Sequence, residues 1–299
     1  MAANLERSTS IDPTRTNAVQ LFALSAAGLQ PLPVPDGVRA AHELFDALPL
    51  GVYSALRTFH HERFLRLERH LERTDRSLEL LGDPARLDRA ALCRGLDRAV
   101  RAYPGPEAFV RFDVLAEPAR ALGTEQRTLL ALSPLVSVPE AFLREGVGVA
   151  ISELRRPRPL IKTARFVLER RPYPLGRQEA FEHLLLDGDG RILEGSSSNF
   201  LGLRGRELHV TGDEALQGVT QGVVAELARE LGLEVVKEPV RLADVSRLDE
   251  AFLTGSTRGI VPVVTLDGHT VANGRPGPWT RRLSDAYREF AEREARPAV

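Results

Sequence analysis

The chain has 299 residues, of which 43% are hydrophobic and 27% are charged, and its formal net charge is −1. This composition is typical of a globular protein large enough to bury a full core, and the near-zero charge gives no basis for binding nucleic acid or an anionic membrane. No apolar run approaches the ~18 residues of a membrane span, no signal-peptide pattern is present, and the single cysteine excludes an intrachain disulfide, so we expect a cytoplasmic protein.

The first half of the chain predicts a small α/β unit. Its strands are indicated by β-rich alternation and its helices by apolar residues at helical spacing. The predicted elements are a strand over 50–59, a helix over 67–81 that stops at Gly82, a helix over 88–102, and paired strands over 108–116 and 127–132. A turn-rich connector follows from Pro134 to Glu145.

The second half predicts a larger unit that is rich in strands. Its predicted elements are a strand over 147–154, a helix over 161–170, a segment over 180–186 that begins helical and ends as a strand, a hairpin turn at 188–190, strands over 200–203, 207–210, 235–240, 250–254 and 263–266, and helices over 219–231 and 280–293. Strands and helices do not alternate strictly, so we expect an α+β fold. The expected domains are residues 1–134, a connector over 135–145, and residues 146–299.

Only two of the forty basic residues are lysines, Lys162 and Lys237. Arginine replaces lysine readily on a solvated surface, but a guanidinium group cannot lose its proton to become a neutral nucleophile. A lysine that persists in so arginine-rich a chain is therefore a candidate for covalent chemistry with a carbonyl group. Lys162 has apolar neighbours, whereas Lys237 lies in an amphipathic run and is expected to be a charge on a strand face.

Three short turns in the second half could surround a single ligand. Glu194 opens the small-residue run Glu194-Gly195-Ser196-Ser197-Ser198-Asn199, which allows the backbone to approach a ligand closely. Two further turns, Gly218-Val219-Thr220 and Gly255-Ser256-Thr257, offer backbone N–H groups and hydroxyls, and the first opens a predicted helix. Such turns are suited to a phosphate group.

The order and spacing of these motifs resemble the fold type IV (class IV) pyridoxal-phosphate aminotransferases, which include branched-chain and D-amino-acid aminotransferases and the aminodeoxychorismate lyases. The resemblance covers about residues 50–286. Its most specific parts are the run from Leu193 to Asn199 and Leu216-Gln217-Gly218-Val219-Thr220, with support from Ile161-Lys162-Thr163 and from the run Phe252 to Val263. It implies a small substrate-binding N-terminal α/β domain and a larger cofactor-binding C-terminal domain.

The resemblance also implies which residues bind the cofactor, pyridoxal 5′-phosphate. Lys162 would hold it as an internal aldimine and, once released, move the proton at the substrate Cα. Glu194 would pair with the pyridinium nitrogen, which keeps the ring able to accept electrons. The other implied contacts are Arg73, Val219, Thr220, Ser256 and Thr257 around the phosphate, Leu216 against the ring, and Ser198 in the serine turn.

Tyr53, Arg111 and Arg258 are expected on the substrate side. Tyr53 matches an aromatic residue of the substrate pocket, and Arg111 matches an arginine of branched-chain enzymes, although a salt bridge on a strand is an equal possibility. Arg258 stands where relatives have a small residue, and it could bind a substrate carboxylate or turn outward to a salt bridge. Val114 replaces the carboxylate-binding arginine of D-amino-acid enzymes, and Val167 replaces the tyrosine of branched-chain enzymes.

The resemblance predicts an aminotransferase that moves an amino group from an amino acid or amine to a 2-oxo acid. A lyase on the same scaffold needs the same lysine, carboxylate and phosphate site, so it remains an alternative, and a non-catalytic cofactor-binding protein is a third. The donor's identity and stereochemistry are left open. We expect a homodimer from the resemblance, and no metal, because the seven histidines show no ligand spacing and Asp187-Gly188-Asp189-Gly190 lacks the remainder of a calcium loop.

Overall fold

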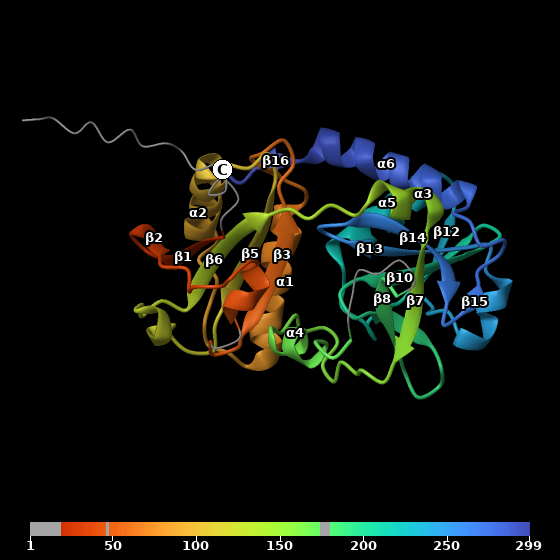
Figure 1. Cartoon of the computed structure of the whole chain (residues 1–299), viewed down its shortest axis with the longest axis horizontal. Coiled ribbons are helices and arrows are strands. Elements are labelled where there is room, and N and C mark those ends of the chain that lie inside the picture. The colour runs from red at the N-terminus through yellow and green to blue at the C-terminus, as the bar shows by residue number, and fades with distance from the viewer. Residues whose placement is uncertain (1–18, 46–47, 174–179) are drawn as a thin grey trace, which may run out of the picture.

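The computed structural model describes residues 19–45, 48–173 and 180–299 of the chain. Two large sheets, each with its own helices, lie side by side (Figure 1), and a third sheet has only two short strands. The α+β fold expected from the sequence is therefore confirmed, with the smaller sheet in the first half of the chain and the larger sheet in the second.

The smaller half contains an antiparallel sheet with the strand order β2-β1-β6-β5-β3. The elements of this half are β1 (Gln20–Ser25), β2 (Gly28–Leu32), the 3₁₀ turn η2 (Ala41–Phe45), β3 (Val52–Arg57), β4 (Arg63–Phe64), α1 (Leu67–Leu81), α2 (Arg89–Ala102), β5 (Ala108–Val114), the 3₁₀ turn η3 (Arg120–Leu122) and β6 (Thr128–Pro134).

Local signals in the sequence set the start of α2 and the end of α1. The backbone N–H of Ala91 donates to the Asp88 side chain at the start of α2, and Gly82 ends α1 in the left-handed conformation with φ of 73°. Buried leucines such as Leu71 of α1 and Leu92 of α2 pack with strand residues in one core. These contacts fix α1 beside β3. In Figure 1, α1 lies between the two large sheets.

The larger half contains a mixed sheet with the order β12-β11-β10-β13-β14-β7-β8-β9, and β15 pairs with β14. Its elements are α3 (Glu140–Glu145), β7 (Val147–Ser152), α4 (Arg165–Glu169), β8 (Glu182–Leu186), β9 (Ile192–Gly195), β10 (Asn199–Arg204), β11 (Glu207–Val210), α5 (Val219–Glu230), β12 (Glu234–Val236), the 3₁₀ turn η4 (Leu242–Arg247), β13 (Glu250–Gly255), β14 (Gly259–Leu266), β15 (His269–Thr270), α6 (Pro278–Glu294) and β16 (Arg296–Pro297).

Helices α5 and α6 pack against each other and against the strands of the larger sheet. Val223, Val224 and Leu227 of α5 share a buried cluster with Leu283 and Tyr287 of α6. The N-terminus of α5 consequently lies at a fixed place at the edge of the larger half.

The end of α6 leads back to the smaller half. Strand β16 pairs antiparallel with β4, so that Arg296 lies opposite Phe64. In Figure 1, α6 runs along the top of the larger half and the C-terminus lies beside α2. Two crossings therefore join the halves: the segment after β6 and the segment after α6.

The helix predicted over 161–170 is wrong at its start, because α4 covers only Arg165–Glu169. The backbone of Lys162 makes tertiary hydrogen bonds instead: its carbonyl accepts from the N–H of Tyr53 at 3.0 Å, and its N–H donates to the Ser77 hydroxyl at 3.2 Å. Thr163 also forms an isolated bridge with Val52. These bonds hold Lys162 beside β3 in a non-helical conformation.

Three other predictions differ from the structure in detail. The helical start expected at residue 180 is wrong, because residues 180 and 181 form a turn before β8, which pairs parallel with β7. The connector contains the short helix α3 after Pro139. The sequence did not predict β1 and β2; Pro31 is tolerated in β2 because β2 is an edge strand.

Within the described ranges, no helix combines the length and the apolar character that crossing a membrane requires. The same residues contain no cluster of three or more His, Cys, Asp or Glu side chains placed to hold a metal ion.

Candidate active site between the two sheets

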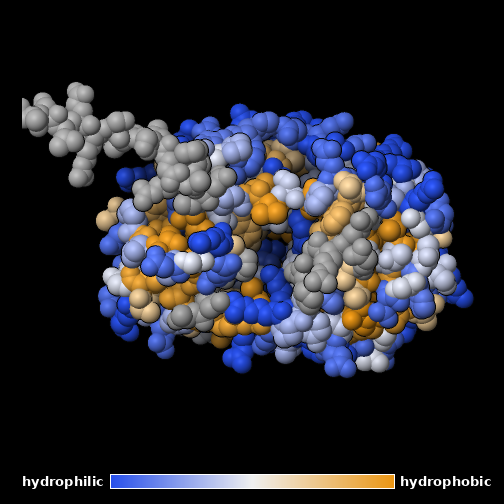
Figure 2. All heavy atoms as spheres, viewed as in Figure 1, coloured by the Kyte–Doolittle hydropathy of each residue, from blue (hydrophilic) through white to orange (hydrophobic). Residues whose placement is uncertain are grey.

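A cavity of about 620 Å³ lies between the two halves and collects every site residue that the sequence predicted. Figure 2 shows the surface hollowed between the halves, with hydrophilic residues in the hollow. The predicted residues that line the cavity are Tyr53, Arg73, Arg111, Lys162, Glu194, Ser198, Leu216, Val219, Thr220, Ser256, Thr257 and Arg258. Residues from both halves of the chain thus meet at one site.

The two lysines have different surroundings. The Nζ atom of Lys162 lies in the cavity, 4.8 Å from the centroid of the Tyr53 ring, whereas Lys237 is exposed after β12. Burial lowers the pKa of Lys162 to about 8; Tyr53 opposes this shift, and the charges of nearby arginines add to it. Lys162 is therefore the lysine whose amine can be partly neutral near physiological pH.

Tyr53 lies among positive charges. Burial alone would raise the pKa of its phenol, but Lys162 and the surrounding arginines, chiefly Arg170 and Arg111, lower it to about 7. The guanidinium carbon of Arg111 lies 4.3 Å from the ring centroid. The hydroxyl of Tyr53 can consequently donate a proton or carry a negative charge near neutral pH.

Tyr53 and Lys162 should make the cofactor-free protein more stable as the pH rises from about 7 to about 10. Their pKa values are about 7 and about 8 in the folded protein, against ordinary values of 10.0 and 10.5 in an unfolded chain. Folding lowers the pKa of both groups. The stability that each group contributes is therefore fully present above its pKa in the unfolded chain and is lost as the pH falls through its pKa in the folded protein. Denaturant unfolding at pH 7, 8, 9 and 10 should give a shallower rise for Tyr53→Phe than for the unchanged protein; parallel curves would contradict the assignment.

Glu194 is held by an arginine that the sequence did not single out. The Nε atom of Arg156 lies 2.7 Å from Oε1 of Glu194, both side chains are buried, and Arg156 stacks 3.7 Å from the ring centroid of Phe166. Burial raises the pKa of the Glu194 carboxyl, while Arg156 and Lys162 oppose that shift. Glu194 is also the one acidic residue among the described residues that line the cavity.

Arg73 reaches across from α1 to the turn before α5. Its guanidinium donates to the carbonyl of Gln217 at 3.3 Å and to the hydroxyl of Ser54 at 3.0 Å, while its Nε is buried with no hydrogen-bond partner in the structure. The Ser54 hydroxyl in turn lies 2.8 Å from Nδ1 of His70. Burial lowers the pKa of His70 well below its ordinary value, and the charge of Arg73 adds to this, so His70 is neutral.

The turn before α5 approaches its neighbours so closely that it requires glycine. A Cβ atom on Gly218 would lie 1.9 Å from Oδ1 of Asn199. The Asn199 side chain donates to the carbonyl of Leu216 at 2.8 Å and so fixes the turn from the other side. Val219 and Thr220 therefore start α5 at the cavity wall, with their N–H groups at the positive end of the helix.

The serine turn wraps around a fully buried carboxylate, Glu182. The hydroxyls of Ser196, Ser197 and Ser198 all donate to its two oxygens. A Cβ atom on Gly195 would lie 2.8 Å from Cγ of Glu182, so glycine is needed there. Burial alone would raise the pKa of Glu182, but Arg258, the hydrogen bonds from Ser196 and Ser197, and the charge of Arg170 together lower it.

Arg258 does not turn outward, which was one of the two alternatives expected from the sequence. It lines the cavity, but its Nη2 lies 3.0 Å from Oε2 of Glu182 and contacts Ser197, so it forms a salt bridge inward instead of outward. Arg111 is similarly paired: two of its nitrogens each lie 2.7 Å from an oxygen of Asp113, and both side chains are buried. Each of these guanidinium groups thus already has a carboxylate partner.

Arg258→Ala should lower the free energy of unfolding by about 3 kcal/mol, because it leaves buried Glu182 without its ion-pair partner. Adding Glu182→Gln should restore most of the loss, since a neutral amide does not need a cation. Chemical unfolding of the holoenzyme at one protein concentration measures both changes. A double variant as unstable as Arg258→Ala would contradict this role, and unchanged KM values for acidic and neutral donors in Arg258→Ala would exclude a substrate contact.

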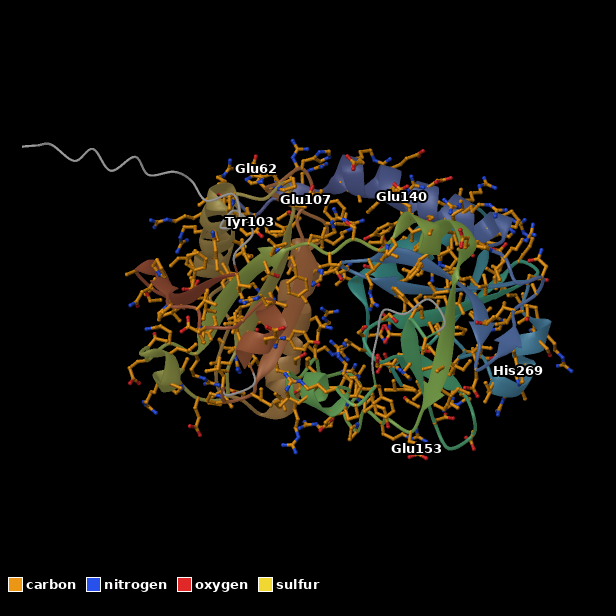
Figure 3. The ribbon with its side chains drawn as sticks, viewed as in Figure 1. Glu62, Tyr103, Glu107, Glu140, Glu153 and His269 are labelled. Carbon is orange, nitrogen blue, oxygen red and sulfur yellow. The ribbon has the colours of Figure 1, made fainter. Side chains whose placement is uncertain are left out.

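Two lining residues, Arg156 and Arg170, and the buried Glu182 behind the serine turn were not predicted from the sequence. Arg156 and Arg170 stand among thirty-eight arginines and carry no signal of their own. Glu182 could have been noticed, because a carboxylate beside Phe181 at the start of an apolar strand must have a buried partner. Figure 3 labels Glu62, Glu107, Glu140 and Glu153 at the outer edges of the two halves, and none of these carboxylates lines the cavity.

Comparisons with known proteins agree with this geometry. The family model described as amino-transferase class IV matches residues 51–266. A probable branched-chain-amino-acid aminotransferase of Thermotoga maritima is 30% identical over 262 residues, which cover 85% of this chain and 92% of the relative. The branched-chain-amino-acid aminotransferase of Pseudomonas aeruginosa is 27% identical over 257 residues, or 80% of this chain and 83% of the relative.

The fold is also found among solved structures. The crystal structure of a putative branched-chain amino acid aminotransferase from Thermotoga maritima aligns with a TM-score of 0.73 at 26% sequence identity, and the alignment covers 91% of this chain and 95% of that one. The T.th. branched-chain amino acid aminotransferase, solved with pyridoxamine 5′-phosphate, aligns with a TM-score of 0.75 at 20% identity and covers 94% of this chain and 98% of that one. The likeness of the fold therefore extends over both halves of the chain.

Proposed function

Because the chain belongs to the class IV aminotransferase family, we propose that the residues of this cavity carry out its reaction, the transfer of an amino group from an amino acid to a 2-oxo acid. The observation that supports this most directly is the meeting of Lys162 and Glu194 in one cavity with Arg73 and the α5 turn. A lysine amine, a carboxylate and an anion-binding turn are the three groups that pyridoxal 5′-phosphate requires.

The cavity residues fit this cofactor. The buried Nε of Arg73 has no hydrogen-bond partner in the structure, and a phosphate oxygen at that position would supply one. The N-terminus of α5 lies on the same wall, with the hydroxyls of Thr220, Ser256 and Thr257. We propose that these groups bind the phosphate, that Leu216 packs on the ring and that Ser198 helps to fix the serine turn.

When bound, the cofactor supplies an aldehyde carbon and an electron-accepting ring. Lys162 would hold the aldehyde carbon and then move the proton at the substrate Cα, and its pKa of about 8 leaves part of the amine unprotonated at neutral pH. Glu194 would hold a proton on the ring nitrogen, with Arg156 keeping its carboxylate ionised and oriented.

The substrate would enter from the smaller half. Tyr53 and Arg111 line this side of the cavity together with the apolar side chains of Ala55, Phe109 and Val167. The relatives are named for branched-chain amino acids, and these apolar walls support amino acids with apolar side chains as donors for this chain too.

A half-reaction screen tests the function. Holoenzyme is mixed with L-amino acids, D-amino acids or (R)-amines in the absence of an acceptor, and conversion of the cofactor to its pyridoxamine form is followed by absorption. We expect conversion by at least one class, reversed by a 2-oxo acid. Pyruvate release from an aminodeoxychorismate-type substrate without conversion would favour the lyase instead, and no reaction with any class would favour a binding protein.

We also propose a homodimer, a cytoplasmic location, and domain limits at residues 134 and 146. The sole cysteine supports a reducing compartment, and the segment between β6 and β7, where one chain crossing joins the halves, supports the limits. Sedimentation of the holoenzyme gives its mass in solution and so tests the homodimer directly.

A further inference from the structure

The positive side chains in the cavity outnumber the carboxylates that pair with them. Among the described residues, six cationic ones line it: Arg73, Arg111, Arg156, Lys162, Arg170 and Arg258. Three of the six have a carboxylate partner, since Arg111 pairs with Asp113, Arg156 with Glu194 and Arg258 with Glu182. The other three are Arg73, Lys162 and Arg170.

Arg170 is the one of these three that the proposed function does not use. Arg73 and Lys162 have roles toward the cofactor there. Over the described ranges, no Asp or Glu oxygen lies within ion-pair distance of Arg170, and its Nη1 donates to the backbone carbonyl of Ser196 at 2.9 Å. A single neutral acceptor holds the side chain at the cavity wall and leaves its remaining donors for a ligand.

The place of Arg170 limits what that ligand can be. The charge of Arg170 acts on Lys162, on Tyr53 and on the buried Glu182, with which it forms no ion pair, and its hydrogen bond fixes it at the serine turn that follows Glu194. The α-carboxylate of an amino acid is bonded directly to Cα. If Cα lies within reach of the Lys162 amine, the α-carboxylate must therefore lie close to that amine as well. Arg170 and Tyr53 line the same cavity as Lys162, and the charge of Arg170 acts on both of these side chains.

We propose that Arg170 binds the α-carboxylate of the amino acid and of the 2-oxo acid, with the Tyr53 hydroxyl as a second donor. A guanidinium group suits this task because its planar donors match the two oxygens of a carboxylate. Arg111 and Arg258 are already paired with buried carboxylates, so they do not compete for this group. The proposal rests on the proposed aminotransferase function and assigns the residue that recognises its substrates.

The test compares a carboxylate with its uncharged analogue. Holoenzyme is titrated with 4-methylvaleric acid and with 4-methylvaleramide, and binding is read from the change in cofactor absorption. In Arg170→Gln, the Kd for the acid should rise about 10- to 100-fold, which corresponds to the loss of one charge-assisted hydrogen bond, while the Kd for the amide should stay the same. Arg170→Lys should fall between Arg170→Gln and the unchanged protein.

Arg165→Gln is the matched control, because Arg165 is an exposed arginine at the start of α4, the short helix that ends just before Arg170, and pairs only with Glu169 among the described residues. It should leave both Kd values unchanged. Equal weakening of acid and amide in Arg170→Gln would overturn the proposal, as would an unchanged Kd for the acid.

Steady-state kinetics test whether Arg170 binds the α-carboxylate of the donor or a carboxylate in the donor's side chain. Arg170→Gln should raise KM similarly for a neutral donor such as leucine and for glutamate; a rise confined to glutamate would overturn the proposal in favour of a distal-carboxylate site. If the unchanged holoenzyme converts no amino acid at all, the proposed function fails, whereas the acid and amide titrations still report on Arg170.

Discussion

Lys162→Ala is expected to lower kcat by at least about 10³-fold, because the variant loses both the group that holds the cofactor aldehyde and the base at the substrate Cα. Lys162 is the lysine of the cavity, with Nζ beside the Tyr53 ring. Lys162→Arg should fail equally, since a guanidinium does not become neutral. Single-turnover kinetics with the best donor from the half-reaction screen measures the loss.

Lys237→Ala is the matched control, because Lys237 is exposed and outside the cavity. It should keep the full kcat. Borohydride reduction of the holoenzyme should attach the cofactor to the peptide that contains Lys162 and leave Lys237 unlabelled. Normal turnover by Lys162→Ala, or label on Lys237, would refute the assignment.

Glu194→Gln is expected to reduce kcat by about 10²- to 10³-fold, the usual cost of removing one preorganised electrostatic contact from an active site. The amide preserves the shape of the side chain but removes the negative charge that keeps a proton on the cofactor ring. Because Arg156 would then lack its ion-pair partner, the variant should also bind the cofactor more weakly. Stopped-flow rates of cofactor conversion and a cofactor titration give the two quantities.

Glu250→Gln is a suitable comparison, since Glu250 is a buried carboxylate that caps the start of α6 and does not line the cavity. The substitution weakens the cap of α6 and lowers the stability of the variant. Its kcat is therefore calculated per mole of folded holoenzyme. On that basis Glu250→Gln should keep the full kcat. A Glu194→Gln enzyme with unchanged kcat would rule out the proposed pairing with the ring nitrogen.

The sequence predicted the composition of the cavity better than its electrostatics. Lys162, Glu194 and the turn at Gly218 could be identified because each lies in a short motif whose residues are consecutive, and the order of the motifs indicated one fold. Helix α1 was likewise predicted at its observed bounds, because its apolar spacing and Gly82 are local signals. Local patterns of this kind do not depend on which other segments pack nearby.

The salt bridge of Arg111 with Asp113, two residues along the same strand, was one of the expected alternatives, but the other two charge pairs of the cavity could not be predicted, because they join distant segments. Arg258 and Glu182 are 76 residues apart, and Arg156 and Glu194 are 38 apart. Nothing near Arg170 in the sequence distinguishes it from the arginines that have carboxylate partners. The conformation of Lys162 was missed for the same reason: bonds to Ser77 and Tyr53, far away in the chain, replace the helix that its local pattern suggested.

The pairing of β16 with β4 has a consequence for biosynthesis. Residues 63–64 leave the ribosome more than 230 residues before their partners at 296–297. At a translation rate of about 5–20 residues per second, β4 remains without its partner strand β16 for on the order of ten seconds or more. Because β4 is only two residues long, it offers little strand edge to other chains, and its pairing with β16 is a late step that ties the C-terminal segment to the smaller half.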